Sequence, residues 1–208
     1  RQMCIRDRGL PTAMFLAKEK LKVLVIDQHA SCGQGQNKAA IGGVRATHSD
    51  PAKIKLCLES LRIYSSWTET YGGDVGWKMG GYCFPVFREA DERLLKSILP
   101  IQKKFGLKID WVGPDVIKEV VPGIKEEGLR GGTYSPNDGQ VSPLMASYEM
   151  HRVAETSGCE FKFNERVQLI TTDKSRVSGV KTDKAHYWAP VVVNAAGAFA
   201  RQLGQSVG

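Results

Sequence analysis

The sequence lacks the cysteine pattern of a disulfide-stapled or zinc-ribbon protein. Its five cysteines are widely spaced and contain no C-x-x-C pair, which argues against both classes and predicts a reducing, cytoplasmic compartment. Long hydrophobic runs are also missing, because stretches such as Val23–Ile26 are far shorter than the roughly 20 residues that cross a bilayer. No apolar segment of a secretory signal is visible at the N-terminus. We therefore expect no integral membrane segment.

Several motifs with well-understood chemistry are absent as well. The sequence has no G-x-S-x-G, no Walker A loop and no pair of carboxylates placed for acid–base work. Its four histidines are not spaced as metal ligands, so no metal site is expected. The net charge of +7 comes from scattered lysines and arginines rather than from a basic cluster interleaved with aromatics. A nucleic-acid partner is therefore not expected.

An alternation of strand and helix patterns is what the sequence does contain. Apolar spacing predicts helices over residues 9–20, 50–71, 90–105, 115–121 and 142–157. Short apolar runs predict strands over 22–27, 81–87, 129–134 and 190–194, and a meander of short strands over 160–188. We expect Pro85 to place its strand at a sheet edge or in a bulge, Pro100 to kink or split its helix, and residues 1–8 to form no strand. The alternation predicts an α/β core into which about residues 75–140 insert a mixed α+β layer.

Gly9 and Asp27 form the strongest local motif. Asp27 ends an expected buried strand and lies 18 residues after Gly9. In dinucleotide-binding βαβ units, an acid about 20 residues beyond the glycine-rich turn accepts hydrogen bonds from the ribose hydroxyls. The complete G-x-G-x-x-G is absent, because Cys4 and Arg6 occupy the positions of its first two glycines. An ordinary surface acid after a strand is therefore an equally open interpretation of Asp27.

Several further segments, in order along the chain, resemble those of one family. The matching segments are Gly9–Ala17, Val23–Asp27, Gly33–Asn37, Ile41–Arg45, Tyr134–Gly139, Glu165–Val167 and Val191–Phe199. Together they resemble the FAD-dependent oxidoreductases of the D-amino-acid oxidase superfamily, which includes glycine oxidase and the sarcosine oxidase β-subunit type. The resemblance covers nearly all of residues 9–208.

This resemblance implies FAD as the cofactor and a role for individual residues. Asp27 would hold the ribose, Val167 the adenine through its backbone, and the glycine-rich loop the phosphates and the flavin, where backbone N–H groups approach closely. Arg45 would tune the flavin from its N1–C2=O edge, although a surface salt bridge is an equally open role for it. The implied cofactor-binding residues are Gly9, Asp27, Gly33, Gly35, Asn37, Gly42, Gly43, Val167, Ala196 and Gly197.

The fold implied by the resemblance is a Rossmann-like FAD-binding core that lacks its first strand and carries an inserted α+β substrate layer. We expect residues 1–75 to form part of the FAD-binding domain, residues 76–140 the inserted layer, and residues 141–208 the return to the FAD-binding domain. Family members extend further at both ends. The chain is therefore expected to be a truncated fragment that is inactive by itself.

The implied activity is oxidation of a small amine or amino acid, of the sarcosine or glycine type, by hydride transfer to FAD. The resemblance to the sarcosine oxidase β-subunit type also implies that the parent protein could form a hetero-oligomer. The alternative from another functional class is a non-catalytic nucleotide-binding module. A yellow colour on purification would distinguish the two, and a nucleic-acid binder ranks last because the basic cluster is absent.

Overall fold

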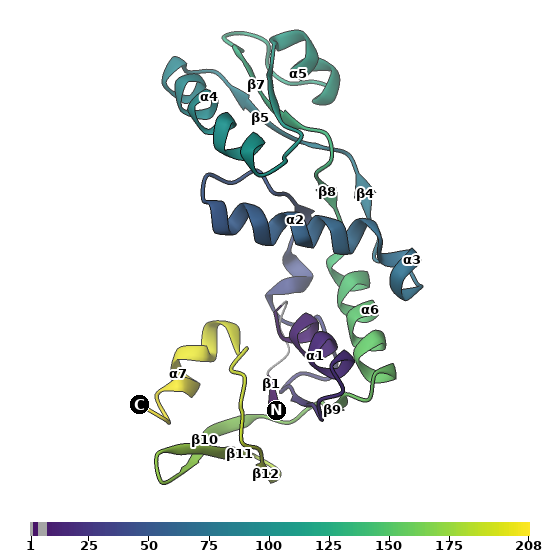
Figure 1. The fold of residues 1–208 in the computed structure, drawn as a ribbon, viewed down its shortest axis with the longest axis vertical. Coiled ribbons are helices and arrows are strands. Elements are labelled where there is room, and N and C mark those ends of the chain that lie inside the picture. The colour runs from purple at the N-terminus through teal and green to yellow at the C-terminus, as the bar shows by residue number, and fades with distance from the viewer. Residues whose placement is uncertain (1, 4–7) are drawn as a thin grey trace. The chain divides into compact units, whose positions relative to one another are not determined.

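A computed structural model describes residues 2–3 and 8–208, and it contains a parallel sheet with the strand order β1-β2-β9. Figure 1 labels the two outer strands of this sheet, β1 and β9, and the helix α1. The central strand β2 (Leu24–Ile26) pairs with β1 (Gln2–Met3) on one side and with β9 (Glu160–Lys162) on the other. Helix α1 (Gly9–Lys18) follows β1 along the chain and leads to β2. This arrangement is the 3-2-1 half of a Rossmann-type sheet, and it confirms the predicted α/β class.

The chain divides into two compact units. Unit 1 comprises residues 1–41 and 143–208, and unit 2 comprises residues 42–142. After α1 and β2, unit 1 contains η1 (Gln36–Ala39), α6 (Pro143–Thr156), β9, β10 (Val167–Asp173), β11 (Arg176–Thr182), β12 (His186–Trp188), η2 (Gly197–Phe199) and α7 (Ala200–Gly204). The predicted domain roles of residues 1–75, 76–140 and 141–208 stay a prediction, since the units are defined by contacts and not by function.

The expectation that residues 1–8 form no strand is wrong for Gln2 and Met3. Both pair with β2 in a parallel register, Gln2 with Leu24 and Met3 with Val25. A parallel ladder is made by backbone groups, so a polar side chain such as Gln2 does not prevent pairing at an open sheet edge. The first strand of the Rossmann-like core is therefore present as a two-residue strand, and residues 1 and 4–7, with Cys4 and Arg6, lie outside the described residues.

Two strand predictions near the C-terminus also need correction. The expected meander contains only β10, β11 and β12, because β9 joins the parallel sheet instead. The run at 190–194, all of it described, is irregular rather than a strand. Its apolar composition made a strand plausible, but a strand also needs a hydrogen-bonded neighbour, and this run has no ladder partner within the described residues.

Unit 2 contains two antiparallel sheets and four helices among its residues, all of which the structure describes. One sheet has the order β3-β8-β4, from Gly43–Val44, Gly139–Gln140 and Lys78–Met79. The other has the order β5-β7-β6, from Tyr82–Val86, Gly131–Ser135 and Asp110–Val112. The helices are α2 (Pro51–Ser65), α3 (Trp67–Tyr71), α4 (Glu89–Lys104) and α5 (Pro114–Val120).

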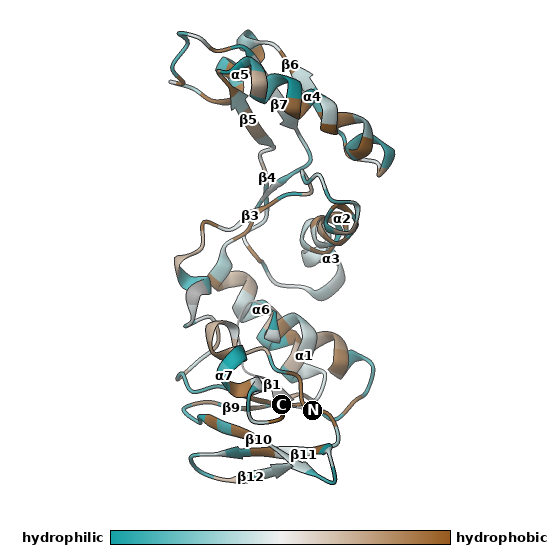
Figure 2. Ribbon diagram, turned by 90° about the vertical axis from the view of Figure 1, so that its left-hand side faces the viewer, coloured by the Kyte–Doolittle hydropathy of each residue, from teal (hydrophilic) through white to brown (hydrophobic). Residues whose placement is uncertain are grey.

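The predictions for Pro85 and Pro100, two of the prolines in unit 2, had different outcomes. Pro85 lies in the edge strand β5, as predicted, where a missing N–H leaves the central ladder intact. Pro100 does not split its helix, because α4 runs through it from Glu89 to Lys104. Figure 2 shows hydrophobic and hydrophilic residues mixed along α4, as expected for a helix with one buried face.

At the start of α2 the carboxylate of Asp50 accepts a hydrogen bond from the Lys53 amide at 2.9 Å, which is the predicted N-cap.

Each unit has a hydrophobic cluster of its own. In unit 1, Ile26 of β2 packs with Ile170 and Val180 of the meander, so the parallel sheet and the antiparallel sheet share a core. The buried cluster of unit 2 consists of Ala46, Ile54, Leu61, Leu99, Leu107 and Ile109. None of the helices in the described part of the chain combines the length and apolar content needed to cross a membrane.

Candidate functional site

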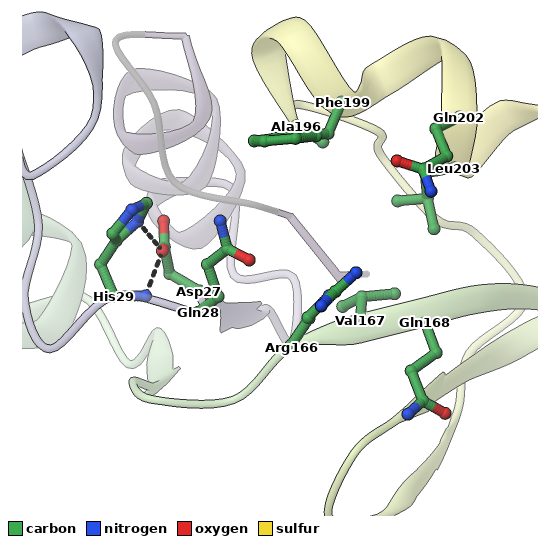
Figure 3. A pocket seen from close by; sticks show the side chains of 10 residues that line it. All are labelled: Asp27, Gln28, His29, Arg166, Val167, Gln168, Ala196, Phe199, Gln202 and Leu203. Atoms are coloured by element: carbon green, nitrogen blue, oxygen red, sulfur yellow. Dashed lines mark hydrogen bonds and ion pairs between the residues drawn. The ribbon is translucent and has the colours of Figure 1, made fainter.

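A pocket of about 210 Å³ lies beside the end of β2 in unit 1 (Figure 3). Its walls come from three stretches far apart in sequence: the turn after β2, the start of β10, and the segment of η2 and α7. The lining residues are Asp27, Gln28, His29, Arg166, Val167, Gln168, Ala196, Phe199, Gln202 and Leu203. Ligands of open α/β sheets bind at the carboxyl ends of the parallel strands, and this pocket occupies such a place.

Backbone hydrogen bonds fix the turn that follows β2. The Asp27 amide donates to the Lys162 carbonyl at 2.9 Å, and the Asp27 carbonyl accepts from the Glu165 amide at 3.0 Å. The His29 carbonyl accepts from the Asn164 amide at 2.8 Å. Pairing between the two chain segments thus continues beyond β2 and β9. The places of Asp27 and His29 at the pocket therefore do not depend on their side chains.

The carboxylate of Asp27 is buried, with only 3% of the residue exposed. Its Oδ1 atom accepts two hydrogen bonds from His29, one from the backbone amide and one from the ring Nδ1, each at 2.8 Å. Figure 3 shows both bonds meeting at one oxygen, while the other oxygen points away from His29. Within the described residues Oδ2 accepts no hydrogen bond. Because a carboxylate oxygen can accept hydrogen bonds, Oδ2 is available to a ligand that brings hydroxyl donors.

Val167 and Ala196 line the same pocket as Asp27, so the structure brings together three of the predicted cofactor-binding residues. Val167 is the first residue of β10 and pairs with Thr182 of β11. Gly197 comes directly after Ala196, starts η2 and has a φ of 58°, a left-handed conformation that glycine adopts without strain. The predicted turn after residue 194 is therefore present, although no strand precedes it.

Gly33 and Asn37 lie in a different part of unit 1, against the start of α6, and Gly35 lies between them in the same loop. Gly33 has a φ of 73°, and a Cβ there would lie 3.3 Å from the Cβ of Ser147. The side-chain Nδ2 of Asn37 donates to the Pro143 carbonyl at 3.0 Å and also to the Ser147 hydroxyl. These contacts give the loop a structural function. Its predicted role at the phosphates stays a prediction.

Gly9 is the buried first residue of α1, a helix that packs against α6. A glycine in the first turn of this helix is the predicted third glycine of the nucleotide motif, whose absent side chain permits close packing. Its predicted contact with the cofactor stays a prediction.

Gly42, Gly43 and Arg45 belong to unit 2, so the predicted glycine-rich loop is divided between the two units. The Gly42 carbonyl accepts from the Val141 amide at 2.9 Å, and Gly43 lies in β3, where a Cβ would be 3.0 Å from the Tyr82 hydroxyl. Gly42 has a φ of 83°, a left-handed conformation that favours glycine, and Gly43 packs closely against Tyr82, so both have a structural reason inside unit 2.

Arg45 has a defined set of contacts within unit 2. Its Nη1 donates to the carbonyl of Thr47 at 2.7 Å and to the Thr47 hydroxyl at 3.1 Å. The guanidinium also lies 5.5 Å from the centroid of the Tyr82 ring and 5.2 Å from that of Phe84. These contacts fix the cation by hydrogen bonds and aromatic rings. The tuning role predicted for it stays a prediction.

Several residues that line the pocket were not predicted from the sequence. His29 lies two residues after Asp27, and this closeness in the sequence could have predicted that its polar side chain lies at the same pocket. Arg166 directly precedes Val167 and belongs to a segment that was singled out only for its backbone. Gln202 lies in a helix with no motif, and only the tertiary fold brings it to the pocket.

Asp138 is the second buried aspartate, and no role was predicted for its side chain. It is 1% exposed, and its Oδ1 accepts from the Ala46 amide at 3.3 Å, while Oδ2 has no hydrogen-bond partner among the described residues. Burial raises the pKa of this carboxyl above its usual value, only partly offset by hydrogen bonding and by the charge of Arg45. The hydrogen bond from the Ala46 amide to Oδ1 connects the start of β8 to the segment that follows β3.

The pocket beside β2 suits the adenosine half of FAD by the chemistry of its groups. Asp27 offers an acceptor oxygen for ribose hydroxyls, and Val167, Ala196 and Leu203 offer apolar surface for a flat ring. Pockets that enclose a whole drug-sized ligand measure about 300–1,000 Å³. The smaller volume here matches one part of a dinucleotide rather than the entire molecule.

A match to a known protein family assigns the chain to that family. The sequence profile of the family described as "FAD dependent oxidoreductase" (DAO) matches residues 9–208. The chain belongs to this family. The predicted family is therefore confirmed, and FAD is confirmed as the cofactor of the family to which the chain belongs.

Individual relatives agree with the family assignment. The chain is 27% identical over 179 residues to 4-methylaminobutanoate oxidase (formaldehyde-forming) of Paenarthrobacter nicotinovorans, covering 85% of this chain and 21% of that protein. It is 26% identical over 208 residues to glycine oxidase of Geobacillus kaustophilus (strain HTA426), covering 96% of this chain and 54% of that protein.

A solved structure extends the agreement to three dimensions. L-Proline dehydrogenase from P. horikoshii superimposes with a TM-score of 0.94 at 26% identity, covering 100% of this chain and 55% of that chain. The predicted FAD-binding fold is thereby confirmed. The chain thus spans about half the length of this dehydrogenase and of the glycine oxidase.

Proposed function

We propose that this chain supplies the FAD-binding part of a flavoenzyme that oxidises an amine or amino acid. The observation that carries the proposal is the pocket at the end of β2, where Asp27 lies beside Val167 and Ala196 and has one carboxylate oxygen to which no described residue donates. Three relatives named for amine or amino-acid oxidation, 4-methylaminobutanoate oxidase, glycine oxidase and L-proline dehydrogenase, support the substrate class. A small glycine- or sarcosine-like substrate is the proposed type.

In this proposal Asp27, Val167 and Ala196 hold the adenosine half of the cofactor. A second group of residues is proposed to bind the phosphates and the flavin, because backbone N–H groups of glycine-rich segments can approach an anion closely. These residues are Gly9, Gly33, Gly35, Asn37, Gly42, Gly43 and Gly197. Arg45 is proposed as a cation that stabilises negative charge on the reduced cofactor. Its fixed geometry supports this, because Thr47 and the two rings hold the charge in place.

When bound, FAD supplies the acceptor for a hydride that leaves the carbon next to the amine nitrogen. Water then hydrolyses the resulting imine to a carbonyl compound and an amine. A neutral amine can release the hydride without a catalytic base. The absence of paired carboxylates from the sequence therefore agrees with this chemistry.

Titration of the chain with FAD and with ADP tests the cofactor part of the proposal. Both ligands should bind, and FAD should bind more tightly, because only FAD reaches the groups proposed for the flavin. Isothermal titration calorimetry measures both affinities. Equal affinity for FAD and ADP would favour the non-catalytic nucleotide-binding module instead.

The substrate class is tested separately. A chimera joins this chain to the part of Geobacillus kaustophilus glycine oxidase that the chain does not cover. Anaerobic mixing with glycine, sarcosine or L-proline should bleach the flavin absorbance, while the matching hydroxy acid glycolate should not. Bleaching by glycolate alone would contradict amine oxidation.

A further inference from the structure

We propose that His29 is a positioning residue that orients the Asp27 carboxylate toward a nucleotide ribose. The proposal rests on the FAD-binding function proposed above and adds to it a residue that fixes the acceptor. His29 lines the same pocket as Asp27, and its side chain is 36% exposed while that of Asp27 is 5% exposed. His29 therefore stands at the rim and Asp27 behind it.

Both hydrogen bonds from His29 converge on a single oxygen of the carboxylate. The backbone amide and the ring Nδ1 each lie 2.8 Å from Oδ1. A carboxylate oxygen only accepts, so Nδ1 must carry a proton. This fixes the ring tautomer when His29 is neutral and leaves Nε2 as the second ring nitrogen.

Two donors on Oδ1 stop the carboxylate from rotating about its Cβ–Cγ bond. Oδ2 then points away from His29, as Figure 3 shows, and no other described residue bonds to it. With the backbone amide as the only donor, the carboxylate would exchange its two oxygens more freely. The imidazole thus converts a mobile acceptor into one with a fixed direction.

The backbone around His29 is held independently of its ring. The His29 carbonyl accepts from the Asn164 amide, and the Asp27 amide and carbonyl pair with Lys162 and Glu165. Replacing the ring therefore leaves the turn in place and changes only the direction of the carboxylate. This separation makes the role testable by side-chain substitution.

The chemistry recognised by a directed Oδ2 is a pair of neighbouring hydroxyl donors. A ribose with free 2′ and 3′ hydroxyls provides them, as in FAD and ADP, and a 2′,3′-dideoxyribose provides neither. A contribution of His29 through the ribose must therefore disappear when the hydroxyls are removed. A merely structural contribution would persist with every ligand.

The experiment compares the unaltered chain with His29→Leu and His29→Asn. Leucine fills the space without a donor, whereas asparagine places an amide N–H near the position of Nδ1. The probes are FAD, ADP and 2′,3′-dideoxy-ADP, measured by isothermal titration calorimetry. His186→Leu serves as the matched control, because His186 lies on β12 and does not line the pocket.

His29→Leu should weaken FAD and ADP binding about tenfold, which corresponds to the lower end of the range for a hydrogen bond to a charged group. His29→Asn should stay within about twofold of the unaltered chain by retaining that bond. Binding of 2′,3′-dideoxy-ADP should be weak and equal in all three proteins. His186→Leu should change no affinity.

Three outcomes would overturn the assignment. Equal FAD affinity in the unaltered, Leu and Asn proteins removes the positioning role but leaves the proposed function intact. An equal loss for ADP and its dideoxy analogue shows a structural role for the ring. Absence of any FAD or ADP binding by the unaltered chain refutes the proposed function and this inference together.

A folding defect in His29→Leu does not end the test. His29→Gln then replaces it, because glutamine keeps an amide but places it one carbon further from the backbone. The Gln variant should bind ADP more weakly than the Asn variant. Equal affinities of the two would contradict a donor at the Nδ1 position.

Discussion

Each unit of the chain buries an aspartate, and the two aspartates are held in different ways. Asp27 of unit 1 lines a pocket, and one of its oxygens accepts two hydrogen bonds from His29 while the other accepts none from the described residues. Asp138 of unit 2 accepts from the Ala46 amide with one oxygen, and burial raises its pKa. The same residue type thus lines a pocket in one unit and connects two segments of the chain in the other.

The sheets differ in a way that matches these roles. Unit 1 contains the parallel sheet, whose strands all end at one edge and so gather polar side chains there. Unit 2 contains only antiparallel pairs in its two sheets, whose strands end alternately at opposite edges. The nucleotide site that we propose lies at this edge of the parallel sheet in unit 1.

The largest expected effects come from two glycines where neighbouring strands pass closely. A Cβ on Gly179 of unit 1 would overlap the Tyr187 carbonyl, and a Cβ on Gly132 of unit 2 would overlap the Phe84 carbonyl. Gly179→Ala and Gly132→Ala should each lower the free energy of unfolding by about 3 kcal/mol, as overpacking against backbone does. Chemical denaturation measures both losses.

Two other glycines serve as controls for these substitutions. An added Cβ would meet only an atom 3.9 Å away at Gly204 in unit 1, and nothing within 4 Å at Gly113 in unit 2. Gly204→Ala and Gly113→Ala should change the free energy of unfolding by less than about 1 kcal/mol. Losses equal to those of the test pair would mean that close strand approach is not the cause.

The next effect concerns the ligand side of the comparison. Asp27→Ala removes the carboxylate that lines the pocket and should cost about 1.5–3 kcal/mol of FAD affinity, the range for hydrogen bonds to charged groups. Titration of the apo-protein with FAD measures this change. An unchanged dissociation constant would make Asp27 an ordinary acid at the end of a strand.

Asp138 should instead affect stability and its pH dependence. Asp138→Ala leaves the buried Ala46 amide without its acceptor and should cost about 1–3 kcal/mol of unfolding free energy. The folded state raises the pKa of Asp138, so the native protein holds this proton more tightly than the unfolded chain does. Stability from this group is therefore fully present below the unfolded pKa and is lost as the pH rises toward the folded pKa.

Asp138→Asn removes that titration while keeping an acceptor oxygen for the Ala46 amide. Relative to the unaltered chain, it should be more stable at neutral pH and should lose this advantage as the pH falls below the unfolded pKa. Urea denaturation across this pH range measures the difference. A pH-independent difference between the two proteins would show that Asp138 does not titrate with folding.

The smallest effect is expected at Arg45, where unit 2 is proposed to influence the cofactor. Arg45→Met should leave FAD bound and lower its two-electron potential by about 30 mV, which equals about 1.4 kcal/mol. A dye-coupled redox titration of the glycine-oxidase chimera, with and without the substitution, measures the shift. Equal potentials with a lower melting temperature would reduce Arg45 to a packing residue held by Thr47, Tyr82 and Phe84.

The sequence by itself determined the alternation of strands and helices, the acid at the end of β2 and the family resemblance. Local signals were sufficient for these features, because apolar periodicity, Asp50-Pro51 at a helix start and the spacing of Gly9 and Asp27 depend only on neighbouring residues. The edge position of Pro85 followed from its missing N–H in the same way.

Only the tertiary structure decided which strands pair and which side chains meet. Glu160–Lys162 pairs with β2 instead of joining the meander, and Gln2–Met3 pairs with β2 on its other side. Residues 190–194 pair with no strand among the described residues. Strand pairing joins residues far apart in sequence, and its hydrogen bonds carry no local signature. For the same reason the pocket of Asp27, His29 and Gln202 could not be read from the sequence, since its walls come from three separate stretches of chain.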